Sequence, residues 1–269
     1  MEAAMRLSRF LTTVALVPLV LVAAPSHAAP PPPSTYLALG DSVAAGVGAS
    51  SPQLGYVPLL LEDLRDDRSC GKGRAIGCRL ESVNLAVPGA TTTDLMDDQL
   101  PAAIALLEER NGNRRPVDDV RLITITIGGN DLLNPVIAAC AAGVTPTCVQ
   151  VATTLVQQVS GSYTTILSRL REAAGHGTTI ALMAYYNPLR DCGPDALAAV
   201  ADLVLEGGGP VPTGLNDVIR TQAAAYGAVV AETYLAIDPS EVQPDCVHPD
   251  DAGHADIAEA FAEVVGAAR

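Results

Sequence analysis

The chain has 269 residues, of which 49% are hydrophobic and 17% are charged. It is too apolar to be disordered, and its length suits one compact domain of the larger kind or two small ones. With 16 basic and 30 acidic side chains, the formal net charge is −14. Nucleic acids and anionic membranes attract cationic surfaces, so the composition disfavours both as partners.

The first 28 residues are expected to be a secretory signal peptide. Arg6 and Arg9 precede an apolar run over residues 10–24, which is too short for an ordinary membrane span. Ser26 and Ala28 place small residues at the −3 and −1 positions of a cleavage site. An uncleaved anchor is the alternative, but we expect a secreted protein with no integral membrane segment after cleavage.

The rest of the chain is expected to be a short tail and one domain. Residues 29–33 are rich in proline, which is typical of a stiff spacer. Residues 34–269 contain no internal repeat and no clear interdomain linker. We therefore expect a single domain over 34–269, present as a monomer.

Six cysteines follow the leader, and an even number in an exported chain suggests three disulfides. The sequence alone leaves many pairings open. Proximity along the chain favours Cys70–Cys78 and Cys140–Cys148, which leaves Cys192–Cys246. A zinc site is the competing interpretation, but no CxxC pair occurs, and we expect no metal.

Five short apolar runs are expected to be strands. The strongest covers residues 120–127, where β-branched residues are continuous enough for a central, buried strand. The other four runs cover 36–39, 80–85, 178–185 and 229–234.

Helical patterns lie between these runs. Apolar residues recur at spacings of three and four over 151–170, which predicts a helix that ends at Gly175. Similar patterns predict helices over 215–226 and 252–265. Strands that alternate with helices indicate a parallel five-stranded sheet in a three-layer α/β/α sandwich. Ligands of such folds bind beyond the carboxyl ends of the strands, where we expect the chemistry.

Four segments at or near strand ends carry side chains suited to chemistry. In chain order they are 40–42 (GDS), 84–89 (NLAVPG), 128–131 (GGND) and 245–249 (DCVHP). Each segment alone is a weak signal. The first has the sequence of an ordinary turn, the third that of a helix start capped by Asn130 or Asp131, and the fourth that of a surface turn. Their joint occurrence, three of them directly after predicted strands, favours a functional site.

With these segments the sequence resembles the SGNH hydrolases, also called the GDSL lipase/esterase family. The match rests on Ser42, Gly89, Asn130 and His248 and extends over about 36–254. With the leader and the cysteines, the chain is most similar to secreted lipases and esterases of actinomycetes. The resemblance implies a flavodoxin-like fold that cleaves carboxylic esters without a cofactor.

The catalytic roles follow from the chemistry of each residue. A serine hydroxyl is a poor nucleophile until a base takes its proton, so Ser42 needs a partner, and His248 is the best base. Asp245 lies three residues before His248, close enough for its carboxylate to fix the tautomer of the ring. Of the other histidines in the domain, His176 is expected to be a solvated turn residue and His254 a capping or surface residue.

The resemblance also assigns the donors that would stabilise the oxyanion of the tetrahedral intermediate. They are the backbone N–H groups of Ser42 and Gly89 and the side-chain amide of Asn130. Glycine suits position 89, because a side chain there would obstruct the approach of substrate. Residues 185–188 follow the fourth predicted strand and either line an acyl pocket or simply pack in the core.

These observations favour a secreted serine esterase or lipase that acts on a small-molecule or lipid ester through an acyl-enzyme. A phospholipase or a carbohydrate deacetylase on the same scaffold is the alternative within the same class. A flavin- or nucleotide-binding module is a hypothesis from another class, but the loop GDSVAAG lacks the P-loop pattern. A non-catalytic binder is disfavoured, because Ser42, Gly89, Asn130 and His248 are all present.

Overall fold

The structure is a computed structural model that describes residues 33–66 and 79–267. The predicted signal peptide, the predicted tail up to residue 32 and the predicted Cys70–Cys78 pair lie outside the described residues.

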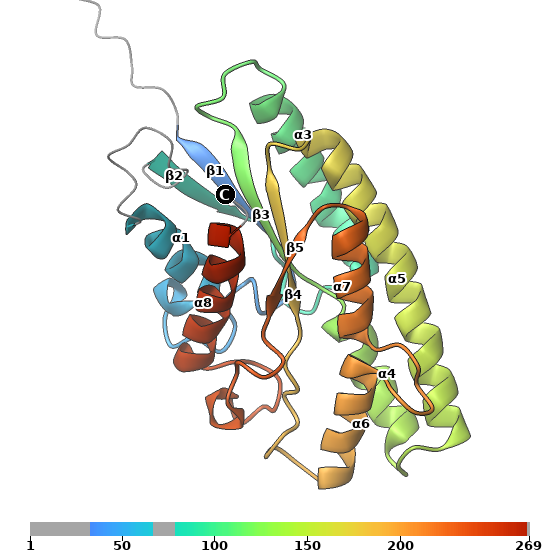
Figure 1. Cartoon of the computed structure of the whole chain (residues 1–269). Coiled ribbons are helices and arrows are strands. Elements are labelled where there is room, and N and C mark those ends of the chain that lie inside the picture. The colour runs from blue at the N-terminus through green and yellow to red at the C-terminus, as the bar shows by residue number, and fades with distance from the viewer. Residues whose placement is uncertain (1–32, 67–78, 268–269) are drawn as a thin grey trace, which may run out of the picture. The chain divides into compact units, whose positions relative to one another are not determined.

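Five parallel strands form one sheet in the order β2-β1-β3-β4-β5. This is the flavodoxin-like strand order, so the predicted fold class is confirmed. The chain moves outward from β1 to β2 and then crosses back to β3, which makes the end of β1 the point where strand order reverses (Figure 1). The strands are β1 Ser34–Gly40, β2 Leu80–Asn84, β3 Val120–Thr126, β4 Thr179–Ala184 and β5 Val229–Glu232.

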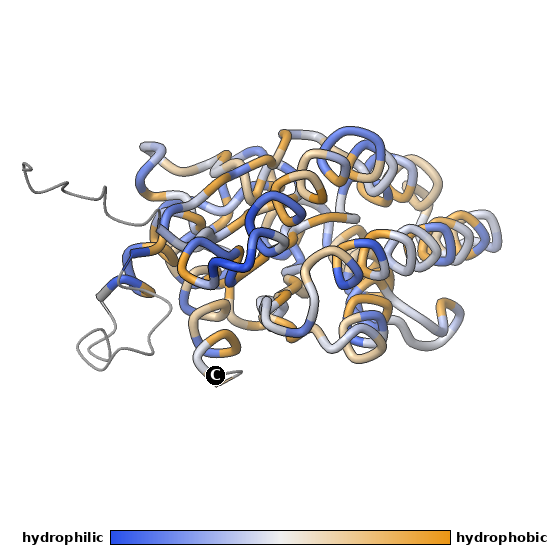
Figure 2. Tube along the Cα trace, turned by 90° about the horizontal axis from the view of Figure 1, so that it is seen from above, coloured by the Kyte–Doolittle hydropathy of each residue, from blue (hydrophilic) through white to orange (hydrophobic). Residues whose placement is uncertain are grey.

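Helices cover both faces of the sheet (Figure 1). One face carries α1 Tyr56–Asp66 and α8 Asp251–Ala267. Figure 2 shows hydrophobic and hydrophilic residues alternating along the turns of the outer helices, as expected where a helix buries one face. The helices on the other side are α3 Leu100–Asn111, α4 Gly129–Cys140, α5 Pro146–Ala174, α6 Asp195–Glu206 and α7 Leu215–Ala225.

The two strongest sequence signals correspond to elements of the structure. Six of the seven residues of β3 are buried, in agreement with its run of β-branched residues. Helix α5 is longer than predicted because Thr145 accepts a hydrogen bond from the N–H of Cys148 and Pro146 occupies the first turn, where its missing N–H costs nothing. The helix ends at Gly175, as predicted.

The pattern analysis did not find α1, α3 or α6, and of α4 it indicated only the start, at residues 128–131. Helix α4 begins after Gly128, whose φ is +111°, and its N-terminus receives no capping hydrogen bond from a side chain. The interpretation that Asn130 or Asp131 caps this helix is therefore wrong. Both side chains instead form hydrogen bonds with residues 90 and 92, in a different segment of the chain.

His254 is wholly buried, so its expected place on the surface is wrong, whereas the alternative of a capping residue agrees with its contact to the first N–H of α1. Its Nδ1 accepts the backbone N–H of Tyr56 at 3.3 Å, and its Nε2 donates to the carbonyl of Val47 at 3.0 Å. Burial lowers the pKa of His254, although the bond to Val47 opposes this effect. The neutral ring thus links α8 to α1 and to the loop after β1. His176 is exposed, as expected.

Gly40 ends β1 in a conformation that requires glycine. Its φ is +135°, and a Cβ at this position would lie 2.0 Å from the carbonyl oxygen of Thr126 on β3. The neighbouring strand therefore approaches the backbone directly before Asp41 and Ser42, which fixes where these two side chains leave the sheet.

We predict that Gly40→Ala destabilises the fold far more than Gly143→Ala. Both glycines have a positive φ, but a Cβ at Gly143 would meet nothing within 4 Å. The Gly143 variant is therefore expected to lose only the conformational term of about 1–2 kcal/mol, whereas the Gly40 variant must also separate β1 from β3. Chemical denaturation of both variants measures the difference, and equal losses would contradict the proposed crowding.

Candidate active site

The segments that follow β1 and β5 meet at the carboxyl edge of the sheet. Ser42 Oγ lies 2.9 Å from His248 Nε2, although the two residues are 206 positions apart in the chain. On the other side of the ring, His248 Nδ1 lies 2.6 Å from Asp245 Oδ2. The structure thus places a hydroxyl, an imidazole and a carboxylate in a row.

A tight turn brings Asp245 to the ring of His248. Asp245 Oδ1 accepts the backbone N–H groups of Val247 and His248, both at 3.0 Å. The N–H of Gln243 donates to the carbonyl of His248 at 2.8 Å and closes the loop. Partial burial raises the pKa of Asp245, but the hydrogen bonds from His248 and Val247 outweigh this, and the net pKa is lowered. The carboxylate beside the imidazole is therefore charged at neutral pH.

Two further contacts hold this loop against the rest of the site. The hydroxyl of Tyr186 donates to the carbonyl of Val247 at 2.7 Å, and Gln243 Nε2 donates to the carbonyl of Gly48 at 2.8 Å. A Cβ at Gly48 would lie 2.1 Å from the carbonyl oxygen of Pro249, so only glycine allows this approach. Sequence reasoning missed these supports, and only the strand-end position of Tyr186 gave a signal for one of them.

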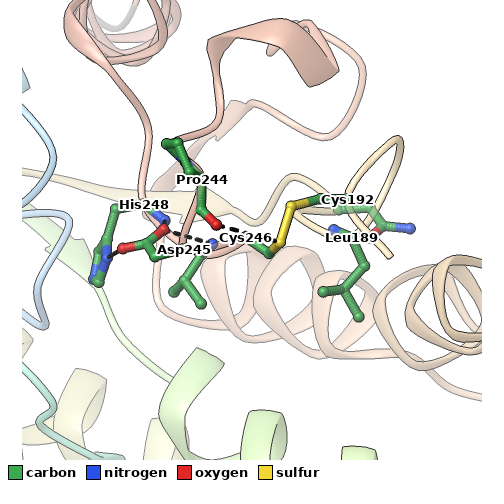
Figure 3. Close-up of a disulfide and its surroundings, with 8 residues drawn as sticks. Leu189, Cys192, Pro244, Asp245, Cys246 and His248 are labelled. Carbon is green, nitrogen blue, oxygen red and sulfur yellow. Dashed lines mark hydrogen bonds and ion pairs between the residues drawn. A yellow bond between two sulfur atoms is a disulfide. The ribbon is translucent and has the colours of Figure 1, made fainter. Parts of the chain in front are cut away.

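A disulfide joins Cys192, in the segment between β4 and α6, to Cys246, between Asp245 and His248 (Figure 3). Cys246 has a φ of +59°, which L residues rarely adopt. A disulfide typically contributes about 2–4 kcal/mol, and this one constrains the loop that carries the imidazole. The structure also contains the pair Cys140–Cys148, between α4 and α5.

The turn after β2 lies beside the end of β1. The N–H of Val87 donates to the carbonyl of Gly40 at 3.0 Å, and Asn130 Nδ2 donates to the carbonyl of Ala90 at 2.9 Å. Within the described part of the chain, the backbone N–H groups of Ser42 and Gly89 donate no hydrogen bond. These two donors are thus available to a bound group.

Gly89 has a φ of +83°, and a Cβ there would meet nothing within 4 Å. The conformation of the turn is therefore sufficient reason for glycine at this position. The expectation that a side chain would obstruct the substrate stays a prediction.

Asp41, directly before Ser42, is a buried carboxylate. It accepts hydrogen bonds from the N–H of Val43 at 3.0 Å, from Thr126 Oγ1 at 2.9 Å and from the hydroxyl of Tyr185. Burial raises the pKa of Asp41 from 3.8 to about 6, even though these hydrogen bonds act in the opposite direction. Asp41 thus anchors the start of the Ser42 turn. Above pH 6 its carboxylate is charged while buried, which destabilises the folded state.

We predict that Asp41→Asn removes a pH dependence of stability. Because the folded pKa lies above the ordinary one, the native state binds more protons than the unfolded state between about pH 4 and 6. Asp41 therefore makes the wild-type protein more stable as the pH falls from 7 to 4, by up to about 3 kcal/mol. Denaturation at several pH values measures this slope, which Asp41→Asn should reduce and the exposed control Asp63→Asn should retain. Parallel slopes in wild type and Asp41→Asn would contradict the raised pKa.

An apolar cavity of about 840 Å³, counted with its open mouth, lies beside Ser42 and Asn130. Its walls come mainly from α4 and α6, and the strand-end residues Tyr185, Tyr186 and Pro188 line it, in agreement with one of the two expectations for this segment. Most of the remaining lining side chains are aliphatic: Leu132, Leu133, Val136, Ile137, Leu197, Val200, Ala201, Val204, Leu205, Leu215 and Val247.

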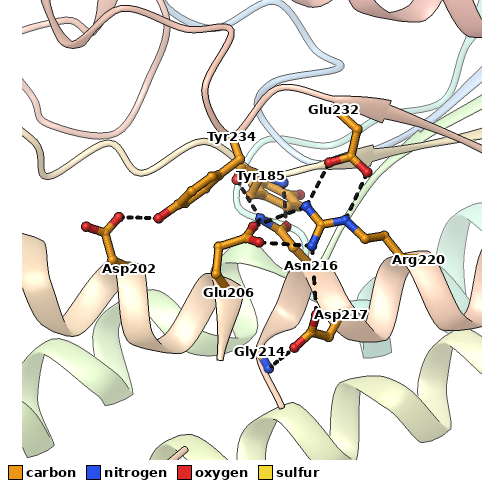
Figure 4. Close-up of polar contacts among 9 residues, drawn as sticks. All are labelled: Tyr185, Asp202, Glu206, Gly214, Asn216, Asp217, Arg220, Glu232 and Tyr234. Atoms are coloured by element: carbon orange, nitrogen blue, oxygen red, sulfur yellow. Dashed lines mark hydrogen bonds and ion pairs between the residues drawn. The ribbon is translucent and has the colours of Figure 1, made fainter. Parts of the chain in front are cut away.

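Polar contacts hold the elements around this cavity (Figure 4). The side chain of Asn216 bonds both backbone groups of Tyr185, at 2.7 and 2.9 Å. Arg220 on α7 bridges Glu206 on α6 at 2.9 Å and Glu232 on β5 at 2.7 Å. Helix α6 therefore presents aliphatic residues to the cavity while charged contacts fasten its end to its neighbours.

A serine, a histidine and an aspartate in a row at the edge of a parallel sheet are the arrangement of a serine hydrolase. In the residues described, no three His, Cys, Asp or Glu side chains are grouped so as to hold a metal ion. The family model described as "GDSL-like Lipase/Acylhydrolase family" matches residues 38–255, and the chain belongs to this family. The protein is accordingly a hydrolase of carboxylic esters, as the sequence resemblance implied.

Solved structures with the same fold include hydrolases with different substrates. The lipase Lip_vut3 from a goat rumen metagenome has a TM-score of 0.62 at 21% identity, and the match covers 86% of this chain and 97% of that one. Axe2, an acetylxylan esterase from Geobacillus stearothermophilus, has a TM-score of 0.58 at 18% identity, with 87% and 95% covered. An extracellular lipase from Streptomyces rimosus has a TM-score of 0.55 at 18% identity, with 88% and 100% covered. No curated protein sequence matches the chain.

Proposed function

We propose that the protein cleaves esters through an acyl-enzyme formed on Ser42. His248 takes the proton of the Ser42 hydroxyl as Oγ attacks the ester carbonyl, and returns it to the departing alcohol. Water, activated by the same ring, then releases the acid and restores Ser42. Asp245 fixes the tautomer of His248 and stabilises the imidazolium that forms in each step.

The oxyanion of the tetrahedral intermediate takes its hydrogen bonds from the N–H groups of Ser42 and Gly89 and from the side-chain amide of Asn130. The two N–H groups donate to nothing else among the described residues, and one amide hydrogen of Asn130 is used by Ala90, which leaves the other for substrate. The observation that carries the whole proposal is the 2.9 Å contact between Ser42 Oγ and His248 Nε2.

We predict that Ser42→Ala lowers kcat by at least about 10⁴-fold, because the nucleophile is lost. Ser51→Ala is the matched control, since its hydroxyl lies on the same loop and makes no capping hydrogen bond. Hydrolysis of p-nitrophenyl butyrate measures the rate, and a fluorophosphonate probe should label the control but not Ser42→Ala. Full activity in Ser42→Ala would show that another residue attacks the ester.

The cavity favours an ester with an aliphatic acyl chain over an acetylated carbohydrate. Its lining is nearly all apolar, and it opens directly beside Ser42, where the acyl group of a substrate must lie. A phospholipase shares this requirement, and a carbohydrate deacetylase, which binds only an acetyl group on its acyl side, does not. We therefore propose a lipase or esterase, with phospholipase as the second candidate.

We predict that kcat/KM rises from acetyl to hexanoyl or octanoyl p-nitrophenyl esters, since each buried CH₂ contributes about 0.8 kcal/mol. Ala201→Phe on α6 fills part of the cavity and should lower kcat/KM for the longer esters at least about tenfold while sparing the acetyl ester. Ala199→Phe is the control, because Ala199 is exposed on the same helix. Parallel assays on a phospholipid and on acetylated xylan separate the remaining candidates, and a preference for acetyl esters would overturn the assignment.

We also propose that residues 1–28 are a signal peptide, that residues 29–33 form a tail, and that the domain over 34–269 acts as a secreted monomer. The disulfides Cys140–Cys148 and Cys192–Cys246 support export to an oxidising compartment. No helix within 33–66 and 79–267 has both the length and the apolar character needed to cross a bilayer.

A further inference from the structure

Two adjacent threonines follow the turn that carries Gly89, and each gives both its N–H and its hydroxyl to one carboxylate. Thr91 donates to Asp94 Oδ2 from its N–H at 2.8 Å and from its Oγ1 at 2.6 Å. Thr92 donates to Asp131 from its N–H at 2.9 Å and from its Oγ1 at 2.6 Å. The two motifs are chemically alike, but they connect different parts of the chain.

The Thr91 motif is local. Asp94 lies three residues later, and the pair forms the capping box of the short helix α2, Thr92–Asp94. It stabilises the turn within itself and is exposed to solvent. It therefore does not fix the position of the turn relative to the rest of the site.

The Thr92 motif connects this turn to α4, 39 residues further along the chain. Asp131 directly follows Asn130, and Asn130 bonds the carbonyl of Ala90 in the same turn. Consecutive residues at the start of α4 thus hold the turn at Ala90 and at Thr92, on the C-terminal side of Gly89. On the N-terminal side, the turn is held to the end of β1 through the N–H of Val87.

The contact is partly buried, because Thr92 lies inside the protein while the carboxylate of Asp131 is half-buried. The exposed fractions of Thr92 and Ala90 are 1% and 3%. Burial raises the pKa of Asp131, although the two bonds from Thr92 oppose this effect. On the buried Thr92 side, water cannot readily replace the lost hydrogen bonds, so we expect their loss to displace the turn.

We infer that Asp131 is a positioning residue that fixes the Gly89 N–H relative to the Asn130 amide by holding Thr92. The inference rests on the proposed function, because it takes these two groups as donors to the oxyanion. Donors of this kind must be held to within about 0.5 Å of the productive geometry. Two bonds to an anchored carboxylate restrict the turn in a way that the single Asn130–Ala90 bond does not.

The test compares Asp131→Asn and Thr92→Val with three other variants. Thr92→Val keeps the shape of the side chain and the N–H bond but removes the hydroxyl, and Thr92→Ser restores the hydroxyl. Asp94→Asn is the matched control, because it disturbs the equivalent threonine–carboxylate motif, whose hydrogen bonds stay within residues 91–94 and do not reach α4. Asn130→Ala tests the proposed oxyanion donor itself. For each, kcat and KM for p-nitrophenyl butyrate, the inhibition constant of a trifluoromethyl ketone and the melting temperature are measured.

We expect Asn130→Ala to lower kcat by about 10²–10³-fold, and Asp131→Asn to lower it by about 10–100-fold, the scale of a misplaced group. Thr92→Val should lower kcat about three- to tenfold, with KM little changed. The ketone forms a tetrahedral adduct, so its affinity should fall in parallel with kcat. Thr92→Ser and Asp94→Asn should stay within about twofold of wild type.

The outcomes separate this inference from the proposed function. If Asn130→Ala keeps its kcat, the oxyanion assignment is wrong and the role of Asp131 is wrong with it. If Asn130→Ala is impaired while folded Asp131→Asn and Thr92→Val keep kcat and ketone affinity, only the positioning role is overturned. An equal loss in Asp94→Asn would also overturn it, since any disturbance of the turn would then suffice.

Discussion

The hydrogen bonds around the last residue of β1 are the constraint on which the site depends. Gly40 is bonded by the side-chain amide of Gln99, which accepts its N–H at 2.8 Å and donates to its carbonyl at 2.7 Å. Gln99 thus takes the place of a neighbouring strand where β2 has ended. The same carbonyl accepts the N–H of Val87, and the N–H of Asp41 donates to Thr126 on β3. The strand end that precedes Ser42 is therefore fixed on both sides. Gln99 itself belongs to a π-helical turn, which is a distortion that recurs at functional sites.

Two aspartates close to Ser42 and His248 have opposite environments. Asp245 is half exposed and bonded by the ring and backbone of His248, so its charge is maintained beside the imidazole. Asp41 is sealed in the core, where three donors hold it and desolvation still raises its pKa. The exposed carboxylate can respond to the charge that develops on His248. The buried one fixes backbone, since its partners lie on the turn of Ser42, on β3 and at the end of β4.

The sequence predicted those features that local patterns encode. The buried strand β3, helix α5 up to Gly175 and the four strand-end segments were all visible as short runs or spacings. What it could not predict depends on partners that are distant in the chain. Gln99 bonds a residue 59 positions away, and His254 bonds one 198 positions away. Asn130 and Asp131 resembled helix caps, because nothing in their own segment shows that Ala90 and Thr92 lie opposite.

The groups proposed for the reaction and much of the wall of the substrate cavity lie on different elements of the fold. The proposed catalytic groups lie on the turns after β1 and β2, on the start of α4 and on the loop after β5, and hydrogen bonds connect these segments. Helix α6 supplies much of the cavity wall and no catalytic group, so its inward residues can change without moving Ser42 or His248. A lipase and an acetylxylan esterase share this fold at 21% and 18% identity with the chain. Among the residues that the structure describes, the Cys192–Cys246 bond is the one disulfide between the segment leading into α6 and the loop that carries His248. Changes at the start of α6 are therefore the ones that can reach His248.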